Sequence, residues 1–260
     1  MRAYVELARA GWRRYSTYRM ATLAGVFTNT VFGFLRAAVL VAALRTVGSI
    51  SGWDTADALT YTWLTQGLIM FVALWNWSDI AIRVQSGDVA TDLQRPIDFQ
   101  GQWLAVDYGR AAYQLFARGL PPFVVGAIAY DLRLPVHPAT WFVFALSLVL
   151  AVAVSFAVRF IVNVSAFWLL DWRGANGIAG VLATGLSGFI VPIAFFPEWA
   201  ARLLTNLPWA AFVQAPIDVF LERPDATFWL VRQTVWAVVL LGAGRVLFEA
   251  ATRKLVVQGG

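Results

Sequence analysis

The stretch at 139–169, ATWFVFALSLVLAVAVSFAVRFIVNVSAFWL, contains a single charged residue and is otherwise almost entirely apolar. An α-helix rises about 1.5 Å per residue, so a stretch of this length can cross the ~30 Å hydrocarbon core of a bilayer. A helix also satisfies its backbone polar groups internally, as the bilayer core requires. The stretch therefore predicts a membrane-spanning helix.

Five other long apolar stretches accompany it, and apolar residues make up 60% of the 260-residue chain against 13% charged residues. A soluble domain of this size could not remove so much apolar surface from water. We therefore predict an all-α, polytopic membrane protein with six transmembrane helices in a lipid bilayer. The other predicted spans are 21–45, 58–82, 105–130, 175–197 and 228–248.

Basic residues are distributed unevenly between the two sides of these spans. Twelve arginines and lysines fall in 1–20, 83–110, 171–175 and 245–260, and five fall on the opposite side. Because cytosolic loops carry the excess of basic residues, both termini are predicted to be cytosolic. The net charge of +5 therefore indicates membrane topology and not nucleic-acid binding.

Several kinds of chemistry are excluded by composition. The chain has no cysteine and one histidine, His137, so we predict no metal site. The only lysine, Lys254, precedes Leu255, so the chain lacks a phosphate-binding P-loop. No paired carboxylates or nucleophile–base arrangement can be assembled, and the chain is predicted not to be an enzyme and to bind no cofactor itself.

The first 20 residues predict an amphipathic helix. At 100° per residue, Tyr4, Leu7, Gly11 and Tyr15 fall on one face and basic residues fall on the other. Such a helix is expected to lie in the inner headgroup layer. A flexible basic tail is the alternative.

The segment 83–104 is the most polar stretch on the predicted cytosolic side. Ser86 is expected to be an N-cap and Pro96 to end the helix, which gives a short helix at about 85–97. Val89 and Leu93 share one face of it. This helix suits docking into a groove on a soluble partner, and an ordered turn between two spans is the alternative.

The region 197–227 lies outside by the charge distribution, yet it is too apolar for a solvated loop. Prolines, among them Pro197 and Pro208, divide it into pieces too short to span. We expect re-entrant helices in the outer leaflet, with Trp199 and Trp209 at the interface. A surface loop without a gating role is the alternative.

The fifth span carries small residues four apart, Gly180, Thr184 and Gly188. Such a stripe allows another helix to approach closely. Packing within the chain and packing between subunits both fit this spacing.

Three arginines lie within predicted spans, where charge is costly and needs a reason. Arg36, Arg118 and Arg159 are expected to line a polar cavity, to reach the headgroups or to pair with a buried acid. Asp79, at the inner end of the second span, is a candidate partner for Arg159.

In the order of these segments and in its length, the chain resembles the type-2 ABC transporter permeases, a class that includes small bacterial drug permeases. The resemblance covers nearly the whole chain. The matching parts are the basic amphipathic segment 1–20, the stretch with Gly87, Asp88, Leu93, Arg95 and Pro96, and the run from Phe196 to Pro208 followed by Pro216.

The resemblance implies a transmembrane subunit of an ATP-driven exporter in the bacterial inner membrane, moving a drug-like, lipid-like or other amphiphilic substrate. The chain would comprise the interfacial helix 1–20 and a permease domain 21–260. Its partners would be a separate ABC ATPase, which holds ATP and Mg²⁺, and a second permease subunit. The implied residues are Gln85, Asp88, Val89, Asp92, Leu93 and Arg95 for coupling, Gly180, Thr184 and Gly188 for the dimer interface, Pro197, Trp199, Pro208 and Trp209 for the outer gate, and Arg36, Asp79, Arg118 and Arg159 for the path or as buried charges.

Other classes of function remain open at this point. An ion-coupled secondary transporter needs no ATPase, but such carriers usually show internal repeats and membrane-embedded acids, and neither is evident in the sequence. A membrane assembly factor without transport activity is a third possibility.

Overall fold

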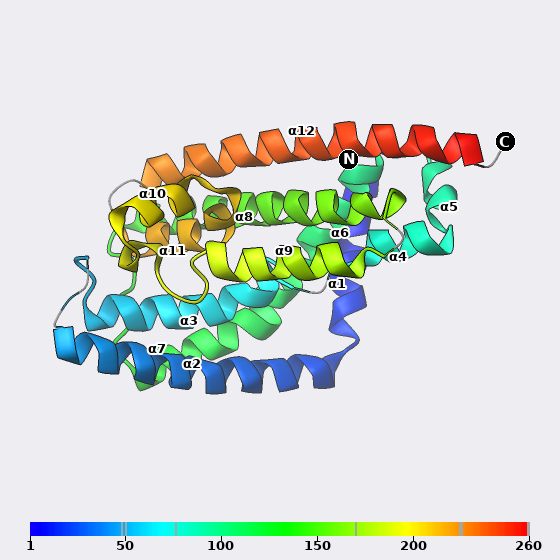
Figure 1. Cartoon of the computed structure of the whole chain (residues 1–260). Coiled ribbons are helices and arrows are strands. Elements are labelled where there is room, and N and C mark those ends of the chain that lie inside the picture. The colour runs from blue at the N-terminus through cyan, green and yellow to red at the C-terminus, as the bar shows by residue number, and fades with distance from the viewer. Residues whose placement is uncertain (48, 50, 76, 170, 224–225, 259–260) are drawn as a thin grey trace.

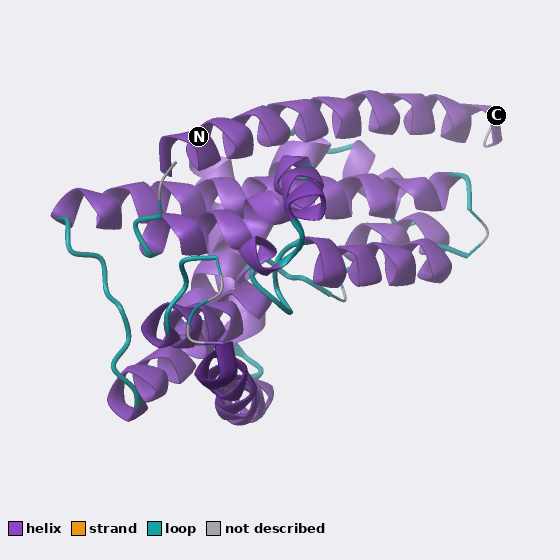
Figure 2. Ribbon diagram, turned by 60° about the vertical axis from the view of Figure 1, so that its left-hand side comes forward, coloured by secondary structure: helices purple, strands orange, loops and turns teal. Residues whose placement is uncertain are grey.

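The computed structural model describes residues 1–47, 49, 51–75, 77–169, 171–223 and 226–258. Within them the chain forms helices joined by loops and turns (Figure 2). The first half comprises α1 Arg2–Ser16, α2 Arg19–Val47, α3 Thr55–Phe71, α4 Asp79–Ser86, α5 Val89–Leu93, α6 Phe99–Gln114, the π-helical turn η1 Leu115–Gly119 and α7 Leu120–Ala129. The second half comprises α8 Pro138–Val164, η2 Ser165–Phe167, α9 Arg173–Leu186, η3 Ile193–Phe195, α10 Glu198–Asn206, η4 Pro208–Phe212, α11 Gln214–Phe220 and α12 Ala226–Gln258.

The long helices run side by side, and the shorter elements lie in two groups, one at each end of the bundle (Figure 1). One end of the bundle holds α4, α5 and the C-terminus, with α1 crossing nearby, and the other end holds α10 and α11. The central helix is α8, which contacts α6, α9, α11 and α12. The segments predicted to be cytosolic and those predicted to be external thus lie at opposite ends of the bundle, and the side of the membrane on which each end lies stays a prediction.

Three of the described helices are long and apolar enough to cross a membrane by themselves. They cover Arg19–Arg45, Pro138–Phe167 and Thr227–Arg253 and correspond to the predicted first, fourth and sixth spans. The predicted third span is continuous helix through α6, η1 and α7, but it contains charged residues. The all-helical fold is confirmed, and the count of six spans stays a prediction.

The second span differs from its prediction of 58–82, because α3 ends at Phe71. Asp54 starts the helix with a capping box, its side chain accepting from the backbone N–H of Asp57. At the other end Ala73 has φ of 48°, which lies in the left-handed region that breaks a helix. A largely apolar segment with Leu74, Trp75 and Trp77 follows this break and leads into α4.

The helix α1 forms as predicted, but much of its apolar face is covered by α6. Gly11 and Gly109 make the crossing possible, since an added Cβ would lie 2.1 Å from the Val106 carbonyl oxygen and 1.8 Å from the Ala8 carbonyl oxygen, respectively. The rim of this contact is aromatic: Trp12 meets Tyr113 edge-on at 5.5 Å. The helix is therefore docked on the bundle.

Candidate functional site

The predicted coupling helix is two helices with a sharp turn between them. Ser86 is the last residue of α4 and not an N-cap, and Gly87 follows with φ of 80°. This left-handed conformation ends helices and favours glycine. The five-residue α5 therefore stands at an angle to α4, at the end of the bundle (Figure 1).

The two faces of α5 have different roles. Val89 is buried in an apolar cluster with Trp77 and Phe99, whereas Leu93 is exposed. Asp92 is also buried, and its carboxylate accepts from the Arg83 guanidinium at 3.0 Å.

The remaining coupling candidates lie on the outside. Leu93, Asp88 and Arg95 are exposed, and Gln85 is exposed while accepting a hydrogen bond of 2.9 Å from the Trp172 indole. The structure thus separates the candidates into two residues that hold α5 and four that a partner could contact.

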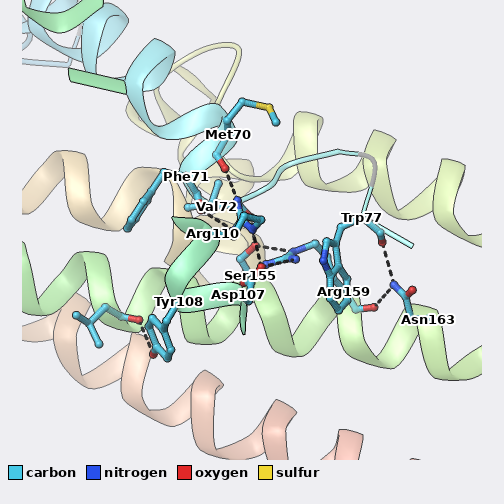
Figure 3. Close-up of polar contacts among 11 residues, drawn as sticks. Met70, Phe71, Val72, Trp77, Asp107, Tyr108, Arg110, Ser155, Arg159 and Asn163 are labelled. Carbon is cyan, nitrogen blue, oxygen red and sulfur yellow. Dashed lines mark hydrogen bonds and ion pairs between the residues drawn. The ribbon is translucent and has the colours of Figure 1, made fainter. Parts of the chain in front are cut away.

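A buried polar cluster lies behind the break between α3 and α4 (Figure 3). Asp107 on α6 is fully enclosed and pairs with Arg110 at 2.6 Å and with Arg159 of α8 at 2.7 Å. We name Asp107, Arg110 and Arg159 the arginine–aspartate cluster. One carboxylate thus neutralises part of the charge of two guanidinium groups.

The cluster and its neighbours bind the backbone of the break directly. Arg110 donates to the carbonyl oxygens of Met70 and Phe71, the latter at 2.9 Å. These carbonyls belong to the last turn of α3, where the regular helical donors end, and that of Met70 also accepts from the Ala73 backbone N–H at 3.3 Å. Figure 3 shows the same arrangement on the other side of the break, where Asn163 donates to the Trp77 carbonyl at 3.0 Å.

Further contacts fix the start of α4. The Asn163 side chain also accepts from the Ala81 backbone N–H at 3.0 Å, and Ser155 donates to the Val72 carbonyl. Side chains of α6 and α8 thus contact the backbone on both sides of the break.

Arg159 does pair with a buried acid, one of the predicted alternatives, but that acid is not the candidate Asp79. Asp79 is the first residue of α4 and pairs with Arg14 of α1 at 2.6 Å. Arg159 instead reaches Asp107 and lies over the Trp77 ring at 5.0 Å. The sequence placed Arg110 on the cytosolic side, whereas it is buried in α6.

The other two predicted buried arginines line one cavity of about 860 Å³ between α2, α3, η1 and α9. Arg36 donates to the carbonyl oxygen of Ile190 at 2.7 Å and to the hydroxyl of Thr65 at 3.3 Å. Arg118 lies against Gly25 of α2, and its buried Nε has no hydrogen-bond partner among the described residues.

The small-residue stripe of α9 is shorter than predicted. The helix ends at Leu186, and Gly188 is buried with φ of 84° where a Cβ would lie 2.5 Å from the Gln214 side-chain oxygen. Gly180 and Thr184 line an open groove instead, and a Cβ on Gly177 would meet nothing within 4 Å. Trp75 covers part of this face, its indole N–H donating to the Thr184 hydroxyl at 2.6 Å, and the described part of the chain leaves the rest open.

The region after α9 consists of the short, proline-bounded helices that the sequence predicted. Pro197 caps α10, Pro208 starts η4, Trp199 is 73% exposed, and Trp209 is partly buried. These pieces pack on α8 and α12.

Gln214 of α11 ties this region to the rest of the bundle. Its side-chain oxygen accepts from the Tyr61 hydroxyl at 3.0 Å and from the Ile193 backbone N–H at 3.1 Å. The region after α9 is thus connected to α3, whose C-terminal end the arginine–aspartate cluster contacts.

Sequence reasoning missed Asp107, which is the centre of the buried cluster. A signal was present: Asp107 and Arg110 are three residues apart within a predicted span, a spacing that puts both on one helix face. The pairing of this face with Arg159 needed the packing of α6 on α8, which a single sequence does not provide.

Comparison with known proteins gives one match. The model of a family described as ABC-2 family transporter protein covers residues 15–259. No curated protein matches the chain.

Proposed function

Because the chain belongs to the ABC-2 family of transporter proteins, we propose that it is the permease subunit of an ATP-driven exporter. The family match carries this proposal, since it covers nearly the whole chain. It supports a membrane-embedded subunit that works with an ABC ATPase, and the chain itself would neither hydrolyse ATP nor hold a cofactor. ATP and Mg²⁺ belong to that ATPase.

The turn formed by α4 and α5 is proposed as the contact with the ATPase. Its outward residues Leu93 and Arg95 are exposed, while Val89 and Asp92 anchor it to the bundle. A coupling element needs both an exposed surface and an anchored one. The ATPase must bind the exposed residues, and the anchored residues must make the turn move together with the spans.

The membrane arrangement is proposed to have six crossings, with both termini and α5 in the cytosol of a bacterial inner membrane. The distribution of basic residues supports this orientation. In it, α10, η4 and α11 form the outer gate.

The open face of α9 is proposed to receive a second permease subunit, identical or homologous. Ile178 and Val181 are 64% and 74% exposed beside Gly177. A Gly177→Trp substitution should therefore release the second subunit during size-exclusion chromatography. The same change at Gly242, which also has open space, is the control, and retention of the second subunit by Gly177→Trp would contradict the assignment.

The coupling assignment is tested by co-purification of an ABC ATPase of the source organism with the tagged chain. The double variant Leu93→Asp and Arg95→Glu should lose the ATPase, because it places acidic groups where an apolar and a basic side chain now face outward. The matched control is Arg253→Glu, which reverses an exposed charge on α12. Undiminished ATPase recovery with the double variant, or proton- or sodium-driven uptake by the chain alone, would refute the proposal.

A further inference from the structure

The cavity between α2 and α9 has an unbalanced charge. Arg36 and Arg118 both line it, and its described lining contains no acidic side chain. Elsewhere the fold does neutralise buried arginines, since Arg110 and Arg159 share Asp107. The missing carboxylate is therefore a property of this cavity.

The two guanidinium groups are held differently. Arg36 is oriented by the Ile190 carbonyl and by its position over the Phe189 ring at 4.8 Å. These contacts favour a cation but do not cancel its charge. Arg118 makes no ion pair or hydrogen bond with the described residues, and its Nε is enclosed without a partner. A cation within a predicted span, half-buried in this way, is costly unless something else pairs with it.

The rest of the lining suits an apolar body. Phe32, Ile69, Met70 and Trp75 contribute apolar and aromatic surface, and Asn29 and Gln66 add amide groups. The volume of about 860 Å³ lies within the range of sites that enclose small organic ligands.

The cations also lie at different depths along α2. Arg118 contacts this helix at Gly25, eleven positions before Arg36. At ~1.5 Å per residue these positions are about 16 Å apart along the helix axis. An anion could therefore be bound first near the inner end of α2 and then deeper in the bundle.

We propose that this cavity binds amphiphiles that carry an anionic phosphate or carboxylate, with the anionic group paired to Arg118 at one depth of the cavity and to Arg36 at the other. Guanidinium groups match both anions through paired N–H donors. That the bound amphiphile is a transport substrate rests on the proposed function. Binding itself does not, because it needs no ATPase.

The test is binding of dodecyl phosphate to the full chain in nanodiscs of phosphatidylcholine, measured without ATP by titration calorimetry. Arg118→Gln and Arg36→Gln should each weaken binding about tenfold or more, as expected for loss of a charge-assisted contact. Arg253→Gln is the control for loss of an exposed charge and should leave binding unchanged. Dodecyl maltoside should bind equally weakly to all four proteins.

Thermal unfolding separates binding from folding defects. Arg118 makes no hydrogen bond or ion pair with the described residues, so Arg118→Gln without ligand should unfold at or above the wild-type temperature. Dodecyl phosphate should stabilise the wild type more than this variant. Equal binding by all variants, or stronger binding of dodecyltrimethylammonium than of dodecyl phosphate, would overturn the proposal.

Lipid analysis distinguishes the two sources of the anion. Anionic phospholipid retained by the purified wild type, displaced by dodecyl phosphate and absent from Arg118→Gln, would identify a bilayer lipid as the occupant. Binding of dodecyl phosphate without retained phospholipid would identify a separate amphiphile. Either result supports the anion site even if the ATPase partnership fails, so the two proposals can fail independently.

Discussion

Asp107 is the residue on which the inner half of the bundle depends most. It is enclosed between two guanidinium groups. Arg110 also donates to the carbonyls at the end of α3, and Arg159 belongs to α8, so the carboxylate links α6 to both helices. A buried pair contributes little against an apolar replacement, but removal of one partner leaves an uncompensated charge.

Asp107→Asn should therefore destabilise the protein by about 3–5 kcal/mol, the range measured for broken buried pairs. Thermal unfolding in a mild detergent would report the loss. Asp131→Asn, at an exposed position, is the control. Adding Arg159→Met to Asp107→Asn should restore part of the stability, and an unchanged unfolding temperature for Asp107→Asn alone would show that the cluster is not structural.

Glu222, in the turn before α12, provides a test by pH. The Thr140 hydroxyl at 2.6 Å, followed by the His137 backbone N–H at 2.9 Å, lowers the pKa of Glu222 from 4.5 to about 2. A lowered pKa stabilises the folded state above pH 4.5, and this contribution is lost as the pH falls toward 2.

The unfolding temperature of the wild type should thus fall further between pH 6 and pH 3 than that of Glu222→Gln. Glu198→Gln, which changes a glutamate of α10 that pairs only with the exposed Arg202 of the same helix, should behave like the wild type. Equal decreases for wild type and Glu222→Gln would mean that the Thr140 and His137 contacts do not hold in solution.

Among the elements, α1 and α6 depend on a close backbone crossing. Gly109→Ala would place a Cβ 1.8 Å from the Ala8 carbonyl oxygen, so α1 should move away from α6. Limited proteolysis should then cut α1 faster. Gly242→Ala, where a Cβ meets nothing within 4 Å, should not change the rate, and equal protection of α1 in both variants would contradict this crossing.

The sequence predicted the elements best where hydrophobicity alone determines them. The first, fourth and sixth spans are long apolar helices, and the prolines correctly indicated the short pieces around Pro197 and Pro208. These signals are local, because they depend on residues close together in the chain.

The ends of α3 and α9 could not be predicted in this way. The break after Phe71 is stabilised by Arg110 and Ser155 from other helices, and Gly188 takes its conformation beside Tyr61 and Gln214. The apolar runs continue past both breaks, so hydropathy alone extends the helices too far. The role of Asp107 was missed for the same reason, as its second cation comes from α8.

At the scale of the whole molecule, the orientation of the bundle is the most accessible property. A reporter fused after Arg95 or Arg253 should be cytosolic, and one inserted after Arg223 should be external, since the basic residues concentrate on the first side. An internal reporter after Arg223 would reverse the assignment of α10 and α11 to the outer gate.

We propose that an ATPase bound at α5 changes the space between α2 and α9 through the break after α3, which α6 and α8 hold. The chain has no cysteine, so spin labels can be placed at Phe27→Cys and Val181→Cys, both exposed apolar positions on these helices. The distance between the labels would be measured in the complex with the ATPase, with labelled copies diluted among unlabelled ones. We predict that trapping ATP on the ATPase shifts this distance, and that Leu93→Asp with Arg95→Glu abolishes the shift. A distance that stays the same with and without trapped ATP would contradict the account.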